Sequence, residues 1–354
     1  RSCRERNPAL KAEPLNALSP TSAVASRALS LPLIAAGLLL FLIIIASLLY
    51  GAGPISASEA FMVLAGSGSE EARFVVSELR LPRTIIGLVT GLALGLAGAL
   101  LQSMTRNPLA EPGLLGVSAG SGFAVALAIL FGASTATLTS FVAQLGALAG
   151  CALVIAATRV QGLGNDPVRL ILAGATLTGL LLALTSMLML MDQRAADEIR
   201  FWITGSIAGK PLSMLQATLP SILAALILIV IVARPLAAMA LGEKAAVGLG
   251  HHPGRIRFLI VLTVALLVGS ATALAGPLIF VGLVVPFIAR AFAGPDIRKT
   301  LWLCVPVGPA VVLAADVVSR LIAAPAELPL GVVTALIGAP VLLAIVRAGR
   351  MPSL

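Results

Sequence analysis

Long apolar runs separated by short polar breaks fill most of the chain. A hydrocarbon core about 30 Å thick requires roughly 20 apolar residues of a crossing helix. Breaks are marked by charges, prolines and glycines, as at Asn107-Pro108 and Gly276-Pro277. Because proline is tolerated in membrane helices, Gly276-Pro277 fits either a tight turn or a kink. The pattern predicts ten transmembrane helices, at residues 31–50, 84–104, 113–131, 141–159, 169–191, 214–233, 258–275, 278–293, 301–322 and 329–347.

Composition agrees with this pattern, because 59% of the 354 residues are apolar and 11% are charged. In soluble domains about 45–50% of residues are apolar and about 25% are charged. We therefore predict an all-α integral membrane protein with one transmembrane domain over residues 31–354. Residues 1–30 are polar and basic, which predicts a mostly disordered cytoplasmic tail. The run at 31–50 is longer than a signal-peptide core, which favours a first span over a cleaved signal.

The helices carry small residues at intervals that permit close packing. Glycines recur three or four residues apart in the second span, at Gly87, Gly91, Gly95 and Gly98. Such spacing lets two helix backbones approach closely, which favours a tightly packed bundle over loosely associated spans.

The net charge of +9 is explained by the distribution of basic residues across the membrane. With the N-terminus inside, 17 of the 24 basic residues lie in inner segments. The seven outer ones are Arg73, Arg80, Arg83, Arg194, Arg200, Lys210 and Arg320. The positive-inside rule then places both termini in the cytoplasm. Nucleic-acid binding is not expected, because there is no run of Lys or Arg and no soluble domain to carry a basic face.

No catalytic motif is found in the sequence, and a glycine-rich phosphate loop is absent. The chain is therefore not expected to be an enzyme, and transport energy would come from a partner or an ion gradient. The three cysteines form no C-x-x-C pair, and the two histidines are adjacent, at His251 and His252, so no metal site or cofactor is expected.

Carboxylates inside the predicted spans are scarce. Asp316 lies within a span, and Glu111 lies at the edge of another. Charges inside lipid are costly and usually functional, and an ion-coupled carrier normally needs more of them. Asp316 is therefore either a functional charge or a hydrogen-bonded residue that fixes helix packing.

Two sequence features have the character of protein contacts. Arg80 and Arg83 share a helix face and, with Arg320, could receive acidic side chains of an external protein. The alternative is internal pairing with Glu78 or Glu327, or snorkelling to headgroups. The inner loop at 234–257 is unusually apolar for a solvated loop, which fits a short helix inserted into a cytoplasmic partner or lying on the bilayer.

Five phrases of the sequence resemble the FecCD-type permeases, which import iron–siderophores, haem and cobalamin. They are residues 78–84, 107–116, 240–245, 276–286 and 326–331. The resemblance implies ten helices in a type II ABC importer permease in the bacterial cytoplasmic (inner) membrane. It also implies a second permease subunit, identical or a close paralogue, and two ATP-binding cassette subunits that hold ATP and Mg. A periplasmic or lipid-anchored binding protein would deliver the substrate.

The resemblance also assigns roles to particular residues. Arg80, Arg83 and Arg320 match the docking residues for the binding protein. The residues that match the helix coupling the permease to the ATPase are Gly242, Glu243, Ala245, Ala246, Leu249 and Gly250. The cytoplasmic gates correspond to Asn107, Leu109, Pro167 and Val168, the last two by position alone. Phe287 departs from the family, in which many members have histidine.

The expected substrate is an iron–siderophore complex, and the segment 199–206 resembles ferric-catecholate permeases. Import of haem or cobalamin by the same mechanism is the alternative. An ion-coupled secondary carrier is the runner-up from a different class.

Overall fold

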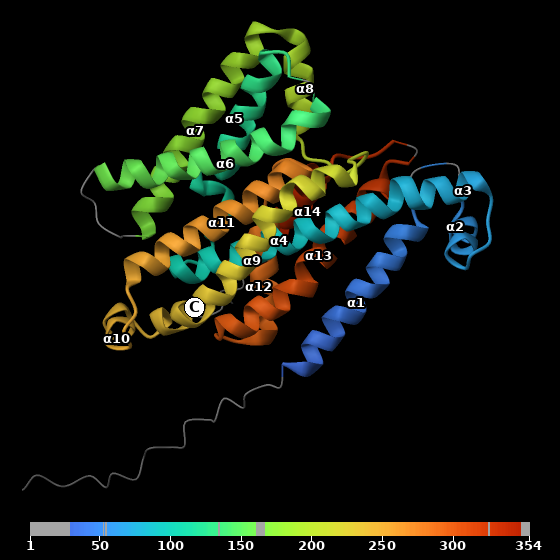
Figure 1. Cartoon of the computed structure of the whole chain (residues 1–354). Helices are drawn as coiled ribbons and strands as arrows, with labels where there is room; N and C mark the ends of the chain where they lie inside the picture. The colour runs from blue at the N-terminus through green and yellow to red at the C-terminus, as the bar shows by residue number, and fades with distance from the viewer. Residues whose placement is uncertain are drawn as a thin grey trace, which may run out of the picture.

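The computed structural model describes residues 29–51, 53, 55–133, 135–160, 167–324 and 326–347, and this part of the chain is helical (Figure 1). The predicted tail lies almost wholly outside the described residues. The helices are α1 (Ser30–Leu49), α2 (Ala57–Leu64), α3 (Glu70–Phe74), the π-helical η1 (Val75–Arg80), α4 (Leu81–Thr105), the 3₁₀ helix η2 (Pro112–Leu115), α5 (Val117–Leu130), α6 (Thr135–Val160), α7 (Pro167–Met191), α8 (Gln193–Ile203), α9 (Leu212–Ala240), α10 (Glu243–Gly248), α11 (Pro253–Ala275), α12 (Val281–Ala293), α13 (Ile297–Ile322) and α14 (Leu330–Arg347).

Each of the ten predicted spans coincides with one of these helices. In the described part of the chain, seven helices are long and apolar enough to cross a membrane, and α5, α12 and α14 are shorter apolar helices. At 1.5 Å per residue, α5 with 14 residues and α12 with 13 cover only about 20 Å of a core about 30 Å thick. Helices α5 and α12 are therefore too short to cross the hydrocarbon core by themselves.

Two breaks that the sequence suggested have different outcomes. Helix α9 does not end where the predicted span ends, at residue 233, because it continues through Pro235 to Ala240. Proline is tolerated inside membrane helices, where neighbouring groups satisfy the freed carbonyl. Gly276-Pro277 is a turn rather than a kink: α11 ends at Ala275, and Gly276 has a φ of 72°, which favours glycine.

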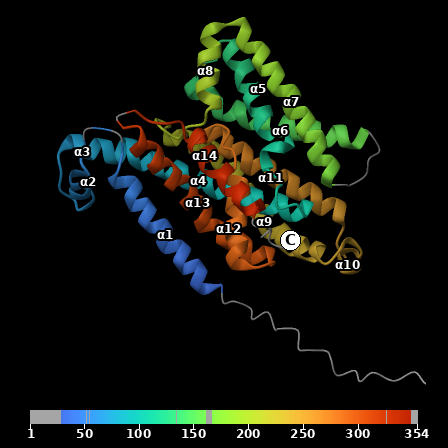
Figure 2. The ribbon, with the colours of Figure 1, turned by 180° about the vertical axis from the view of Figure 1, so that it is seen from behind.

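Helix α4 lies at the centre of the bundle and packs against α1, α9, α11, α12 and α13 (Figure 1). The spanning segments that contain α4 and α11 are the most buried, whereas α1 packs at the periphery against α13. Helices α5 to α8 pack mainly on one another and contact the rest largely through α11 (Figures 1 and 2). The molecule therefore consists of a dense group around α4 and a second group of four helices beside it.

The close approach of helices depends on glycine pairs, as the spacing along the second span predicts. A Cβ atom added to Gly98 would overlap the carbonyl oxygen of Gly282 in α12, and one added to Gly91 would overlap that of Gly308 in α13. These neighbours are backbone atoms, which cannot rotate away as a side chain does. Backbones in contact gain dispersion energy that lipid does not supply, so the glycines fix the distances from α4 to α12 and α13.

We predict that Gly98→Ala lowers the stability of the protein by about 1–3 kcal/mol, the usual cost of overpacking. The measurement is the thermal unfolding midpoint of the purified protein in detergent. Gly37→Ala in α1 is the matched control, because no atom lies within 4 Å of its added Cβ. Equal midpoints for the two variants would contradict the packing role of Gly98.

Candidate functional site

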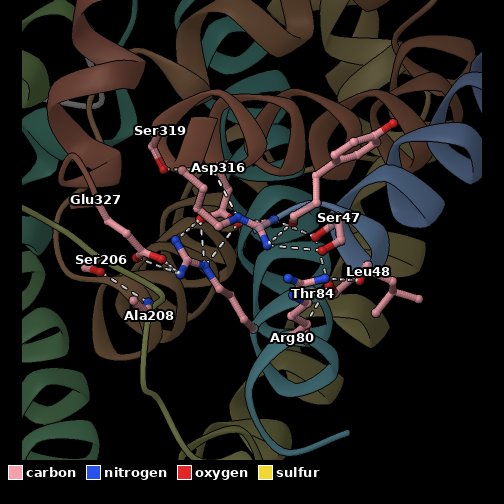
Figure 3. Close-up of polar contacts among 12 residues, drawn as sticks. Ser47, Leu48, Arg80, Thr84, Ser206, Ala208, Asp316, Ser319 and Glu327 are labelled. Carbon is pink, nitrogen blue, oxygen red and sulfur yellow. Dashed lines mark hydrogen bonds and ion pairs between the residues drawn. The ribbon is translucent and has the colours of Figure 1, made fainter. Parts of the chain in front are cut away.

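Three arginines, Arg80, Arg83 and Arg320, meet at the end of the bundle where α1 ends and α4 begins. Figure 3 shows this site around Asp316, Glu327 and Arg80. Asp316 lies between two of them, with Oδ1 2.8 Å from Arg83 Nη2 and Oδ2 2.8 Å from Arg320 Nη2. Arg83 also binds Glu327, with Nη1 2.7 Å from Oε2. Because Asp316 is fully buried, its charge is stable there only with such partners. The interpretation of Asp316 as a packing residue therefore fits its contacts.

The same arginines complete the C-terminal end of α1. Arg80 Nη1 donates to the carbonyls of Leu48 (3.0 Å) and Leu49 (2.7 Å). Arg320 Nη1 donates to the carbonyls of Ser47 (3.1 Å) and Tyr50 (2.9 Å). The last carbonyls of a helix lack partners within the helix and carry its negative dipole end. Cations at this position therefore satisfy both the hydrogen bonds and the charge.

The three arginines do not form an exposed basic surface on the outer side of the protein. Arg80, Arg83 and Arg320 are 4%, 9% and 2% exposed, so their charges do not face solvent. The alternative of internal pairing with Glu327 is confirmed. The side chain of Glu327 is 31% exposed and is the more accessible partner of Arg83. A docking role for the arginines stays a prediction, and it requires an incoming group to displace an internal one.

A second buried arginine site lies near the other end of α4. Arg290, in the last turn of α12, is 4% exposed and donates to Gln102 Oε1 (2.7 Å) and Ser103 Oγ (3.2 Å). Gln102 in turn donates to the carbonyl of Leu283. The charge distribution along the sequence places Arg290 among the inner basic residues and does not predict its burial. Its position inside an apolar run was the signal available.

The predicted gate residues that the structure describes form a tight turn after α4. Asn107 Oδ1 accepts a hydrogen bond from the backbone N–H of Leu109 (2.9 Å), and the Asn107 carbonyl accepts one from Ala110. This side-chain turn directs the chain out of α4, and Leu109 remains 40% exposed. Pro167 and Val168 begin α7, and their side chains lie outside the described residues.

The predicted coupling segment contains the short helix α10. Its first residue, Glu243, forms an ion pair with Arg257 of α11, which ties α10 to the bundle. Ala246 is fully buried against the core, whereas Val247 and Leu249 are 58% and 63% exposed. Gly242 and Gly250 flank the helix with φ values of 115° and 81°. The apolar surface offered to a partner is therefore that of Val247 and Leu249, and Ala246 faces inward.

A cavity of about 270 Å³ lies between α5, α7, α8 and the turn before α12. Its lining includes Glu111, Thr178 and Trp202. The Nε1–H of Trp202 and the hydroxyl of Thr178 are buried without a hydrogen-bond partner within the described part of the chain. Unsatisfied polar groups favour contact with water or a polar passenger. The wall of this cavity therefore carries polar groups beside its apolar residues.

The apolar pattern along the chain does not predict helix α8, because it places these residues in an outer connection. Ala196, Ile199 and Trp202 recur three residues apart and are buried against the neighbouring helices. This helical spacing was the signal that could have found it. Phe287, the departure from the family pattern, lies in α12 and is partly buried.

The residues of the described ranges contain no group of three or more His, Cys, Asp or Glu side chains placed to hold a metal ion. Cys151 and Cys304 are buried and unpaired with each other. The described residues therefore offer buried ion pairs, closely packed helices and an exposed apolar segment.

Comparison with known proteins identifies the family. The model of the FecCD transport family matches residues 38–348. The ferric enterobactin transport system permease protein FepD of Escherichia coli (strain K12) is 43% identical over 330 residues, which cover 92% of this chain and 97% of that protein. The Fe(3+)-citrate import system permease protein YfmD of Bacillus subtilis (strain 168) is 36% identical, covering 85% and 89%.

A solved structure, described as an inward-facing conformation of a metal-chelate type ABC transporter, has a similar fold. Its TM-score is 0.77 at 32% sequence identity, with 90% of this chain and 99% of that chain covered. The match of the family model extends over all ten apolar helices except the first turns of α1. The chain therefore belongs to the FecCD transport family.

Proposed function

We propose that this chain is the membrane-spanning permease subunit of a binding-protein-dependent ABC importer that carries an iron–siderophore complex into the cytoplasm. The observation that carries the proposal is the 43% identity to a ferric enterobactin permease along almost the full length of both chains. A similarity confined to one motif would leave the substrate open. This similarity covers 92% of the chain and so includes the helices, the turns and the coupling segment.

Energy would come from ATP and Mg bound by separate cytoplasmic subunits. The sequence has no phosphate-binding loop, so hydrolysis by the chain itself is not expected. An ion-coupled carrier needs a carboxylate that gains and loses a proton or metal ion during transport. Asp316 is poorly suited to that task, because Arg83 and Arg320 occupy both of its oxygens. The contacts therefore favour an external ATPase over an ion gradient.

A catecholate siderophore is the substrate that the similarity favours within the chelate class. The segment 199–206, at the end of α8, resembles ferric-catecholate permeases, and FepD is named for ferric enterobactin. A relative named for ferric citrate is less similar, at 36%. Haem and cobalamin are the alternatives that share the same mechanism.

The assembly would contain two permease subunits, identical or paralogous, two ATPase subunits and an external binding protein. Both termini and α10 would lie on the cytoplasmic side, where the positive-inside rule places them. The end that carries Arg83 and Glu327 would then face the binding protein. A carboxylate of the binding protein would replace Glu327 as the partner of Arg83. Docking would then break the internal ion pair between Arg83 and Glu327.

Reconstitution tests the whole proposal. The permease is inserted into liposomes with the ATPase encoded beside it, and ATP hydrolysis and chelate uptake are measured with and without the binding protein. We expect hydrolysis stimulated by the loaded binding protein and accumulation of a ferric catecholate above ferric citrate, haem or cobalamin. Uptake that follows an ion gradient without any ATPase would overturn the proposal, and preference for another chelate would correct the substrate.

The exposed surface of α10 provides the second test. We predict that Val247→Asp with Leu249→Asp reduces co-purification of the ATPase at least about tenfold, because two charges replace apolar contact area. Leu64→Asp in α2, at a residue that is 48% exposed, is the matched control for introducing a charge. Undiminished co-purification would remove α10 from the ATPase interface. Ala246 is unsuitable for this test, since any larger side chain there would first disturb the core.

Removal of the internal competitor tests docking at Arg83. We predict that Glu327→Gln increases the affinity for the binding protein by up to about fivefold, because a partly exposed ion pair is worth up to about 1 kcal/mol. Glu78→Gln removes a charge from an exposed residue near the same end and is the control. Weaker or unchanged binding by the Glu327 variant, measured by surface plasmon resonance in nanodiscs, would contradict carboxylate exchange.

A further inference from the structure

A groove of about 390 Å³ opens between α9 and α13, and α4 forms its floor. Residues at helical intervals line it from both sides: Leu226, Ile229, Val230 and Ala233 from α9, and Leu301, Trp302 and Val305 from α13. The α9 residues follow the spacing i, i+3, i+4 and i+7, and the α13 residues are three or four positions apart or adjacent. One continuous face of each helix therefore borders the groove. Because all three helices are candidate spans, the groove lies at the depth of lipid chains.

Two arginines lie at one end of this apolar groove. Arg234 follows the α9 face, and Arg298 begins the α13 face, one turn before Trp302. Both are exposed, and neither guanidinium has an ion pair or a side-chain hydrogen bond within the described ranges. The carboxylate of Asp296 accepts the backbone N–H of Arg298 at the start of α13. The groove thus combines an apolar length with an end lined by two arginines.

We propose that this groove binds an anionic phospholipid, with its acyl chain along α9 and α13 and its phosphate between Arg234 and Arg298. An arginine guanidinium binds phosphate through paired N–H groups, and basic pockets between membrane helices suit anionic headgroups. The chemistry of the groove selects a lipid over a soluble phosphate, because most of its surface is apolar.

The accessibility of the groove wall supports a lipid occupant. Leu96, Ile229 and Leu301 form a buried base at 3%, 9% and 6% exposed, whereas Val230 and Trp302 at the rim are 77% and 63% exposed. An exposed tryptophan beside cations is typical of the membrane–water interface. With the orientation proposed above, the arginines lie at the cytoplasmic leaflet, whose anionic lipids attract basic side chains.

Fluorescence of Trp302 tests the site directly, because the chain has only two tryptophans, Trp202 and Trp302. The full-length Trp202→Phe variant is placed in phosphatidylcholine vesicles that contain either brominated phosphatidylglycerol or brominated phosphatidylcholine. Bromine quenches an indole at short range, so the extent of quenching reports the occupant of the groove. If Trp202→Phe does not fold, the difference between the wild type and Trp302→Phe gives the same signal.

We expect phosphatidylglycerol to be preferred about 25-fold over phosphatidylcholine at low salt, since each arginine contributes about fivefold. Arg234→Gln with Arg298→Gln should abolish the preference, and Arg255→Gln, at an exposed cation of α11 outside the groove, should retain it. Equal quenching by both lipids, absence of quenching by either because protein covers the groove, or the same loss in Arg255→Gln would each overturn the proposal. None of these readouts depends on transport, so the result is independent of the substrate.

Discussion

A buried carboxylate shared by two arginines determines how one end of this protein is built. Asp316 is within 2.8 Å of both Arg83 and Arg320, and all three side chains are nearly removed from solvent. Losing one member of such a group leaves an uncompensated charge, at a cost of about 3–5 kcal/mol. The remaining positive charge is balanced by the carbonyl end of α1 and by Glu327. Three parts of the chain, the end of α1, the start of α4 and the stretch from Asp316 to Glu327, therefore meet where their charges require it.

Helix α4 connects this end of the molecule to the other. It supplies Arg83 near its start, Gly91 and Gly98 in the middle, and Gln102 and Ser103 for Arg290 near its end. Sliding or rotating α4 would break two polar sites and move its backbone into those of α12 and α13. These helices are consequently held as one unit, and α5 to α8, which pack mainly on one another, are less constrained by it.

The sequence was sufficient to predict the ten apolar helices, because charges, prolines and glycines separate their apolar runs. It also identified the glycine contacts of α4 and an exposed apolar helix near residue 245. It did not predict that Pro235 lies inside α9, since proline has the same local chemistry in a kink and in a break. The burial of Arg83 and Arg320 depends on their shared partner, Asp316. Asp316 lies one turn from Arg320 on α13 but 233 residues from Arg83 along the chain, so only the fold brings Arg83 to it.

The internal pairing of Asp316 also bears on how energy enters the protein. A carboxylate with both oxygens held by arginines gains little from a passing cation, because the cation would have to displace an existing positive charge. At the other end, α10 presents Val247 and Leu249 to the surroundings and is anchored to α11 through Glu243 and Arg257. Helix α11 is buried along most of its length and packs on α4, α6 and α9. A force applied at α10 would therefore reach both helix groups through α11, whereas an ion at Asp316 would act on a site already occupied.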